Sequence, residues 1–246
     1  MTPEAPRISP GTGQDSPDRS PLDVPPAPTD VARRVFGDRL ELAVRYAARL
    51  SNEGVRHGHL GPREVPRLWD RHLVNCALLS DLVPAGARIV DVGSGAGLPG
   101  LPMALRRADL RVDLVEPMLR RTRFLESAVG ELGLADRVRV VRGRAEEPMV
   151  RAAVGNSDWV VTRAVAPLDR LVRWCLPLLT PGGSLLALKG ASARDEVTEH
   201  RRALQRAGAE HVEVIRLGAD GGTGTWVVRV DRAGHSGRGP GSGKRS

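Results

Sequence analysis

The chain has 246 residues, a formal net charge of +8 and an isoelectric point near 10.9. Its residues show no basic-then-apolar signal pattern and no apolar run approaching the roughly 18 residues of a membrane span. The two cysteines, Cys76 and Cys175, are too few and too ill-spaced for a disulfide framework or a metal site. We therefore expect a cytoplasmic protein with reduced core thiols, no metal, no membrane contact and a polyanionic partner such as nucleic acid.

The first 30 residues differ from the segment that follows them. Residues 1–30 contain eight prolines and little apolar surface, so they bury too little to offset the entropy of ordering, and we expect a disordered tail. Apolar residues then recur at helical spacing over 31–54, and a second helix is predicted over 67–82. Residues 31–84 are thus expected to form an N-terminal helical cap.

From residue 85 onward, strand and helix patterns alternate. Strands are predicted over 88–92, 112–116, 138–142, 159–163, 184–189, 211–217 and 225–230, with helices over 99–108, 118–133, 147–154, 168–179 and 192–207 between the first six. This alternation predicts a Rossmann-like α/β fold with a mostly parallel sheet.

The last two strands are joined only by Gly218–Gly224, which is too short for a crossover helix, so we expect them to form an antiparallel hairpin. A seven-stranded sheet that ends in such a hairpin is typical of class I S-adenosylmethionine-dependent methyltransferases, whereas a nicotinamide-binding domain has no need of it. The folded domain is expected to span 31–231, with its core over 85–231. Residues 232–246 are rich in Gly, Ser and basic residues and are expected to be a disordered basic tail.

The positive charge belongs mainly to the folded part of the chain. Residues 1–30 carry a net −3 and residues 232–246 a net +4, so the region between them keeps +7. Lysine occurs only at Lys189 and Lys244, and codon bias in a GC-rich genome would account for this preference for arginine but not for the excess of basic over acidic residues. This excess favours a nucleic-acid partner.

A glycine-rich turn follows the first predicted strand. Gly93, Gly95 and Gly97 alternate there, and glycine lets the backbone turn sharply and approach a ligand closely. The helix that follows presents unpaired N–H groups. This arrangement indicates a site for the polar part of a nucleoside cofactor.

This segment has three possible interpretations: a site for S-adenosylmethionine, a site for a nicotinamide or flavin cofactor, or a purely structural turn. Gly95–Gly100 satisfies the dinucleotide fingerprint, and Glu116 lies about 20 residues further on, as that fingerprint expects. However, the strand stops at Val92, so the turn begins two residues before the fingerprint. Asp91 would repel a pyrophosphate but attract the ammonium and sulfonium groups of S-adenosylmethionine. The register therefore favours S-adenosylmethionine over a nicotinamide or flavin cofactor and over a structural turn.

The ends of the next three strands supply further candidates, because ligands of such sheets bind beyond the carboxyl ends of the strands. Glu116 ends the second strand and is placed to accept ribose hydroxyls, or else to cap the next helix. Gly143–Glu147 follows the third strand and offers backbone N–H groups for adenine, or else is a solvated helix start. Arg163 ends the fourth strand beside the cleft, or else forms a surface salt bridge.

Several motifs together resemble one family. They are Trp69, Arg71–Asn75, Val92–Gly100, Glu116–Leu125, Gly143–Glu146, Arg163-Ala164 and Leu188–Gly190. On these segments the chain, from about residue 31 to 230, is similar to the RsmG (GidB) family of bacterial 16S rRNA guanine-N7 methyltransferases. The pairing of Arg71-His72 with the Gly-Leu-Pro-Gly turn is the more specific part, since many methyltransferases share the glycines.

The resemblance implies transfer of a methyl group from S-adenosylmethionine to N7 of a guanine in the small-subunit rRNA. It assigns cofactor binding to Gly93, Leu98, Ala145, Glu146 and Arg163. The chain departs from the family at Glu116-Pro117, where many members have Asp-Ser, at Arg120, where they have lysine nearby, and at Cys76, where they often have serine. The acid is retained, so ribose binding remains the expectation.

The sequence indicates less clearly which residues contact the RNA that accepts the methyl group. Guanine N7 has a lone pair and no proton, so its methylation needs no general base, and catalysis rests on positioning. Arg71 and His72 are our candidates for contact with the RNA, against a purely structural contact between helix and sheet. Lys189 is a candidate for a phosphate contact, against a solvated strand end. Because aromatic residues are few, stacking on the base falls to arginine or Trp69.

Two other functions share these features. A methyltransferase acting on a small molecule would use the same cofactor site but would have an apolar lid and no basic rim. A non-enzymatic RNA-binding module would retain the fold alone. A monomer is expected in each case.

Overall fold

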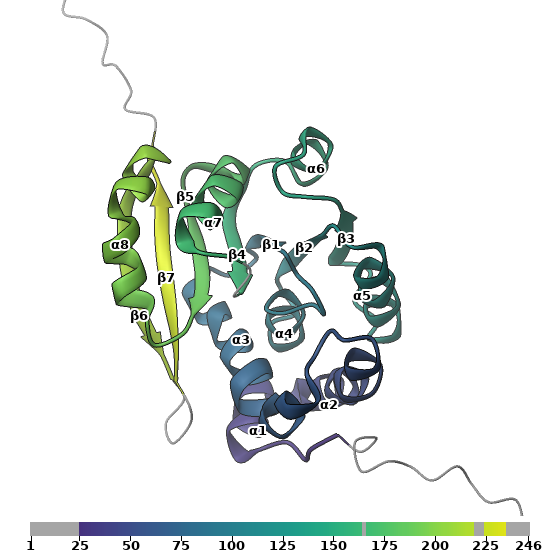
Figure 1. Cartoon of the computed structure of the whole chain (residues 1–246). Helices are drawn as coiled ribbons and strands as arrows, with labels where there is room; N and C mark the ends of the chain where they lie inside the picture. The colour runs from purple at the N-terminus through teal and green to yellow at the C-terminus, as the bar shows by residue number, and fades with distance from the viewer. Residues whose placement is uncertain (1–24, 164–165, 219–223, 235–246) are drawn as a thin grey trace, which may run out of the picture.

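The computed structural model describes residues 25–163, 166–218 and 224–234, and the two tails predicted from composition lie mostly outside them. Among the described residues, seven strands form one sheet in the order β3-β2-β1-β4-β5-β7-β6 (Figure 1). The strands are β1 (Arg88–Val92), β2 (Arg111–Glu116), β3 (Val138–Arg142), β4 (Ser157–Arg163), β5 (Leu179–Lys189), β6 (Ala209–Leu217) and β7 (Thr225–Arg232). The predicted Rossmann-like seven-stranded fold is confirmed.

The predicted antiparallel hairpin is also confirmed, and the sheet adds a detail about its place. β7 pairs antiparallel with β6 on one side and with β5 on the other, so the last strand of the chain lies inside the sheet. All other pairings are parallel. The hydrogen bonds of β7 are therefore used on both edges, and β6 and β3 form the edges of the sheet.

The largest boundary error concerns the helix predicted over 168–179. α7 (Leu168–Cys175) is followed by a 3-10 turn at Leu176–Leu178, and β5 already starts at Leu179, five residues before the predicted start. Pro177 lacks an N–H and cannot continue the α-helical bonds, so α7 ends before it.

Helices cover both faces of the sheet (Figure 1). They are α1 (Asp30–Phe36), α2 (Leu40–Arg49), α3 (Asn75–Leu78), α4 (Gly100–Arg106), α5 (Leu119–Glu131), α6 (Pro148–Val154), α7 and α8 (Ala193–Arg206). Successive strand residues alternate between two apolar cores: Ile89 packs in the core with α1 to α5, and Val90 packs in the core with α6 to α8. None of the described helices is long and apolar enough to span a bilayer.

The N-terminal cap is helical as predicted, but neither of its two segments is one regular helix. The first is broken at Gly37, whose φ of +49° ends α1, before α2 starts at Leu40. The second winds as a π-helical segment over Leu68–Val74, then α3, then a 3-10 turn. The cap is joined to the start of the described chain, because Trp69 Nε1 donates to the carbonyl of Pro26 at 2.7 Å.

Candidate functional site

The glycine turn lies at the carboxyl end of β1, next to β2. Its three glycines have positive φ values, +72° at Gly93, +59° at Gly95 and +104° at Gly97, a region that disfavours other residues. Gly93 and Ser94 donate their N–H groups to the carbonyl of Val115 at 2.9 and 3.1 Å, which ties the turn to the end of β2. The predicted start of the turn at Gly93 is therefore correct.

Gly95 and Gly97 are required for different reasons. A Cβ on Gly97 would lie 2.4 Å from Leu101 Cδ1 and 3.0 Å from the Tyr46 hydroxyl, so this glycine is needed for packing between α4 and the cap. A Cβ on Gly95 would meet nothing closer than the Gly93 carbonyl at 3.9 Å. The space in front of Gly95 is thus open to a ligand, while Gly97 is buried. Gly93 and Leu98 are partly exposed beside Gly95.

Glu116 links the turn to the next helix. Its side chain is 1% exposed, and its two oxygens accept hydrogen bonds from the N–H groups of Gly95 at 2.9 Å and Met118 at 3.0 Å. Arg121 Nη1 lies 3.8 Å from the carboxylate. Each carboxylate oxygen has two lone pairs, so acceptor capacity remains for a further donor such as a hydroxyl.

Asp91 is a second carboxylate at this end of the sheet, and it is fully buried under the turn. Oδ2 accepts the N–H of Gly100 at 3.0 Å, whereas Oδ1 has no hydrogen-bond partner. Burial raises the pKa of Asp91 to about 7, and the neighbouring Glu116 carboxylate adds to that rise.

The raised pKa of Asp91 predicts a stability effect. The unfolded carboxyl ionises near its ordinary pKa of 3.8 and the folded one near 7, so its favourable contribution is full below 3.8 and is lost as the pH rises through 7. Asp91→Asn keeps an acceptor for Gly100. We therefore expect the ligand-free variant to gain stability relative to the parent between these two pH values. Urea unfolding at stepped pH measures the difference, and parallel curves would contradict the assignment.

The segment after β3 contains two further candidates for cofactor binding, Ala145 and Glu146. Ala145 is buried and Glu146 is exposed, and a cavity of about 490 Å³ lies beside them, lined by Pro117, Met118, Gly143 and their neighbours. Since Pro117 and Met118 follow Glu116, the ends of β2 and β3 face the same cavity. The arrangement can hold a flat heterocycle next to a hydroxylated group bound at Glu116.

These residues fit S-adenosylmethionine better than a dinucleotide. Asp91 and Glu116 place two carboxylates behind the turn, and an anionic pyrophosphate would be repelled there while a sulfonium would be attracted. The open space at Gly95 is the place on the turn that a ligand could approach.

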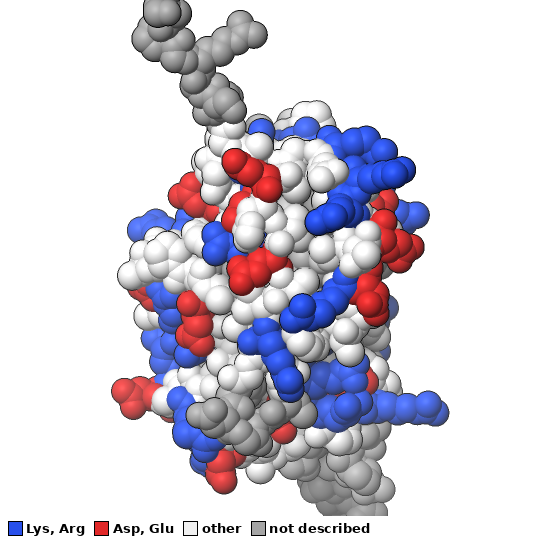
Figure 2. All heavy atoms as spheres, turned by 90° about the vertical axis from the view of Figure 1, so that its left-hand side faces the viewer, with Lys and Arg blue, Asp and Glu red and all other residues white. Residues whose placement is uncertain are grey.

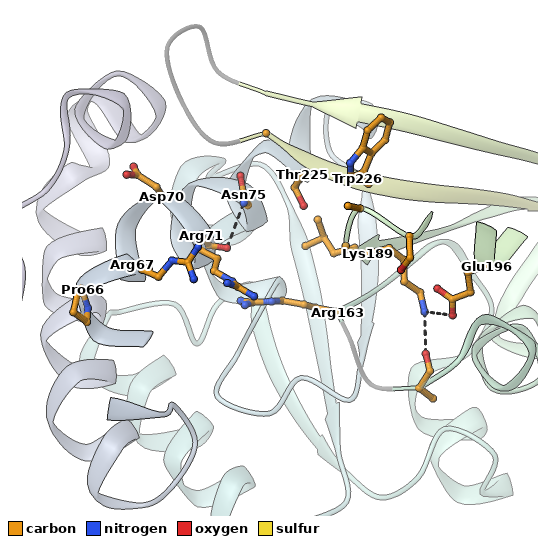
Figure 3. A pocket seen from close by; sticks show the side chains of 16 residues that line it. Pro66, Arg67, Asp70, Arg71, Asn75, Arg163, Lys189, Glu196, Thr225 and Trp226 are labelled. Carbon is orange, nitrogen blue, oxygen red and sulfur yellow. Dashed lines mark hydrogen bonds and ion pairs between the residues drawn. The ribbon is translucent and has the colours of Figure 1, made fainter. Parts of the chain in front are cut away.

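A larger cavity of about 740 Å³ lies between the helical cap and the carboxyl ends of β4 and β5 (Figure 3). Arg67 and Arg71 line it from the cap, Arg163 from β4 and Trp226 from β7. In Figure 3 the guanidinium groups of Arg71 and Arg163 point toward one another. Such a charged lining suits a polar ligand that carries phosphate.

The sequence candidates for the target side occupy different positions around this cavity. Arg71 lies at its wall with a side chain that is 51% exposed, while His72 is only 5% exposed and lies beneath Arg163. Lys189 is already paired: its Nζ donates to Glu196 Oε1 at 2.8 Å and to the carbonyl of Ala166 at 3.0 Å. Lys189 therefore offers a phosphate less charge than the sequence suggested.

Arg163 and His72 are in direct contact, 91 residues apart in the sequence. Nη2 of Arg163 donates to His72 Nδ1, and Nη1 lies 3.6 Å from the sulfur of Cys76. The other ring nitrogen of His72 lies 2.8 Å from Glu64 Oε2. Ala164, which the sequence motif includes, lies outside the described residues.

Sequence reasoning missed Glu64, Glu196 and Trp226. Nothing local marks them, because Glu64 and Glu196 act through partners on other elements. Asn75 was quoted only as part of a motif, yet it lines the cavity with an unpartnered Oδ1.

The two cysteines lie in the apolar cores. Both are buried free thiols, and burial raises the pKa of Cys76 to about 11 and that of Cys175 further. Within the ranges that the structure describes, no three His, Cys, Asp or Glu side chains are grouped to hold a metal ion.

The antiparallel β7 within a parallel sheet, together with the glycine turn and two carboxylates at β1 and β2, defines an S-adenosylmethionine-dependent methyltransferase. Solved structures agree on the fold. A Methanococcus maripaludis structure described as an S-adenosyl-L-methionine-dependent methyltransferase superposes with a TM-score of 0.53 at 13% identity, covering 76% of this chain and 93% of that one. A structure from Agrobacterium tumefaciens, described as an O-methyltransferase, gives a TM-score of 0.52 at 19% identity over 65% of this chain and 82% of that chain.

Sequence comparison identifies the family. The profile described as "GidB: rRNA small subunit methyltransferase G" matches residues 39–221. The Ribosomal RNA small subunit methyltransferase G of Salinispora arenicola is 57% identical over 203 residues, which is 80% of this chain and 84% of the relative. The protein of the same name from Mycobacterium marinum is 54% identical over 211 residues, which is 86% of this chain and 91% of the relative. The chain belongs to the GidB family of rRNA small subunit methyltransferases, which confirms the resemblance seen in its motifs.

Proposed function

We propose that this chain transfers the methyl group of S-adenosylmethionine to N7 of one guanine in 16S rRNA. The observation that carries this proposal is the 740 Å³ cavity between the helical cap and the carboxyl ends of β4 and β5, with Arg67, Arg71 and Arg163 in its lining. Its volume lies within the range of roughly 300–1,000 Å³ that encloses small ligands. Guanidinium groups both pair with phosphate and stack on bases, so the lining suits an unstacked nucleotide.

The cofactor would be held by residues from four strand ends. The turn at Gly93, Gly95 and Leu98 faces its methionine part, and Glu116 accepts its ribose hydroxyls. Ala145 and Glu146 lie on the adenine side. Arg163 is the remaining residue, and its guanidinium suits the methionine carboxylate, the one anionic group of this cofactor.

The chain contributes binding and positioning to the reaction. When bound, S-adenosylmethionine supplies an electrophilic methyl: the N7 lone pair forms the new N–C bond, and the electrons of the broken S–C bond stay on sulfur. Because N7 carries no proton, no side chain has to remove one. Positioning of this kind lowers a barrier by roughly 7–11 kcal/mol in good cases. Asp70 lines the cavity, and its carboxylate would favour the positive charge that the purine gains.

The charge distribution supports an RNA substrate over a small molecule. A small-molecule methyltransferase would close its site with an apolar lid, whereas arginines line this cavity from two directions. On the side of the molecule that carries α8 and β6, blue and red side chains are interspersed (Figure 2).

Methyl transfer to defined substrates tests the proposal. We expect the purified protein and labelled donor to label 16S rRNA, either as naked RNA or in small subunits from cells that lack the enzyme. Borohydride reduction and aniline cleavage should then cut the RNA at one guanine, since this chemistry requires a 7-methylguanine. Label on another atom, or only on metabolites, would refute the proposal.

A further inference from the structure

We propose that His72 is a positioning residue, which fixes the guanidinium of Arg163 at the cavity by accepting its hydrogen bond on Nδ1 while Glu64 holds the opposite ring nitrogen. This inference rests on the proposed function, because it explains how Arg163 is oriented toward the cofactor. It replaces our expectation that His72 touches the RNA itself, since this side chain is buried.

The hydrogen bonds determine the tautomer of His72. A guanidinium has donors and no acceptor, so Nδ1 must accept the bond from Arg163 Nη2. The ring proton therefore resides on Nε2, which donates to Glu64 Oε2 at 2.8 Å. Both ring nitrogens therefore make hydrogen bonds, and these two bonds fix the orientation of the imidazole.

The charges around the ring keep it neutral. Burial and the positive charge of Arg163 lower the pKa of His72 to about 4, against the opposing effect of Glu64. The hydrogen bond from His72 in turn lowers the pKa of Glu64, which remains ionised. A neutral acceptor can bind Arg163, whereas an imidazolium would repel it.

Arg163 needs such support because another cation faces it. Arg71 points toward it across the cavity, and Arg71 Nε lies 3.5 Å from Glu64 Oε2, the atom that also binds His72 (Figure 3). The Glu64 carboxylate thus contacts both Arg71 and His72, the residue that binds Arg163. His72 and Cys76 engage two of the five N–H groups of Arg163, which also lines the cavity. A ligand carboxylate would meet a guanidinium already in place.

Two substitutions, each of which keeps a polar atom near one of the two ring nitrogens, separate a positioning role of His72 from simple packing. In His72→Asn the side-chain oxygen takes the place of Nδ1, so an acceptor for Arg163 remains. In His72→Gln the amide reaches the place of Nε2, so the contact with Glu64 remains and the acceptor for Arg163 is lost. We expect His72→Gln to weaken S-adenosylmethionine binding about ten- to a hundredfold, as for the loss of a hydrogen bond to a charged group. His72→Asn should stay within about threefold of the parent.

A double-mutant cycle with Arg163→Gln gives the decisive readout. If His72 acts through Arg163, His72→Gln costs no further affinity in the Arg163→Gln background. Equal losses in the two single His72 variants, or additive losses in the cycle, would overturn the inference. Thermal unfolding shows which variants are folded. If a His72 variant fails to fold, the cofactor affinities of Glu64→Gln and Glu64→Ala are compared instead, because Glu64 binds the other ring nitrogen of His72.

The readout also distinguishes this inference from the proposed function. Cofactor affinity is measured by calorimetry without RNA. If the protein methylates no guanine N7 but the cycle shows coupling, the positioning role stands and the substrate assignment fails. If 16S rRNA is methylated but the cycle is additive, only the positioning role is wrong.

Discussion

Gly95→Ala is expected to abolish S-adenosylmethionine binding, at least a hundredfold in affinity, in a protein that still folds. Gly95 has no protein atom within 3.9 Å of the position of an added Cβ, so that methyl group would occupy the space in front of the turn, where the ligand is expected. The strain of a φ of +59° on alanine costs about 1–2 kcal/mol, which a domain of this size tolerates.

The structure offers a matched control for that strain. Gly133, at the end of α5, has a φ of +66° and also has nothing within 4 Å of an added Cβ, but it lies away from the glycine turn. Gly133→Ala should lose similar stability in urea unfolding and bind the cofactor like the parent in calorimetry. Unchanged binding by Gly95→Ala would mean that the ligand does not approach the turn there.

Glu116→Gln is expected to weaken cofactor binding about ten- to a hundredfold. The buried carboxylate accepts the N–H groups of Gly95 and Met118, and it would also accept the ribose hydroxyls. A glutamine amide has one acceptor oxygen only, so its NH2 group would face a backbone donor, and one acceptor for the ribose would be lost. Glu126→Gln, on the exposed side of α5, makes the same change of charge and should bind normally.

A cofactor analogue isolates the part played by the ribose. S-adenosylhomocysteine and its 2′,3′-dideoxy derivative differ only in the two hydroxyls that Glu116 is expected to hold. The loss of affinity in Glu116→Gln should therefore be several-fold smaller for the dideoxy compound. An equal loss with both compounds would show that Glu116 supports only the turn, through Gly95 and Met118.

Local patterns were sufficient to predict much of this protein. The turn at Gly93 follows a strand that ends at Val92, as the apolar run and the glycines indicated. The antiparallel direction of β7 followed from the length of the preceding connection alone. Glu116 is predictable as a candidate because ligands of such sheets bind beyond the carboxyl ends of the strands.

Other features could be known only from the tertiary structure. Gly97 looks like its neighbours in the sequence, yet it packs against Tyr46 of the cap. Lys189 looks like a free cation, yet Glu196 neutralises it. His72 looks like a surface group in a basic motif, yet it is buried between Glu64 and Arg163.

The physical reason is the range over which each property is decided. Strand, turn and connection depend on residues within a few positions of one another, so apolar periodicity, glycine content and segment length predict them. The charge state and the role of a side chain depend on its partners, and here the sheet and the cap bring those partners together from segments up to 91 residues apart. Local sequence patterns therefore predict the fold and the candidate site, while packing decides which of the candidate side chains are exposed and which are bound to other residues.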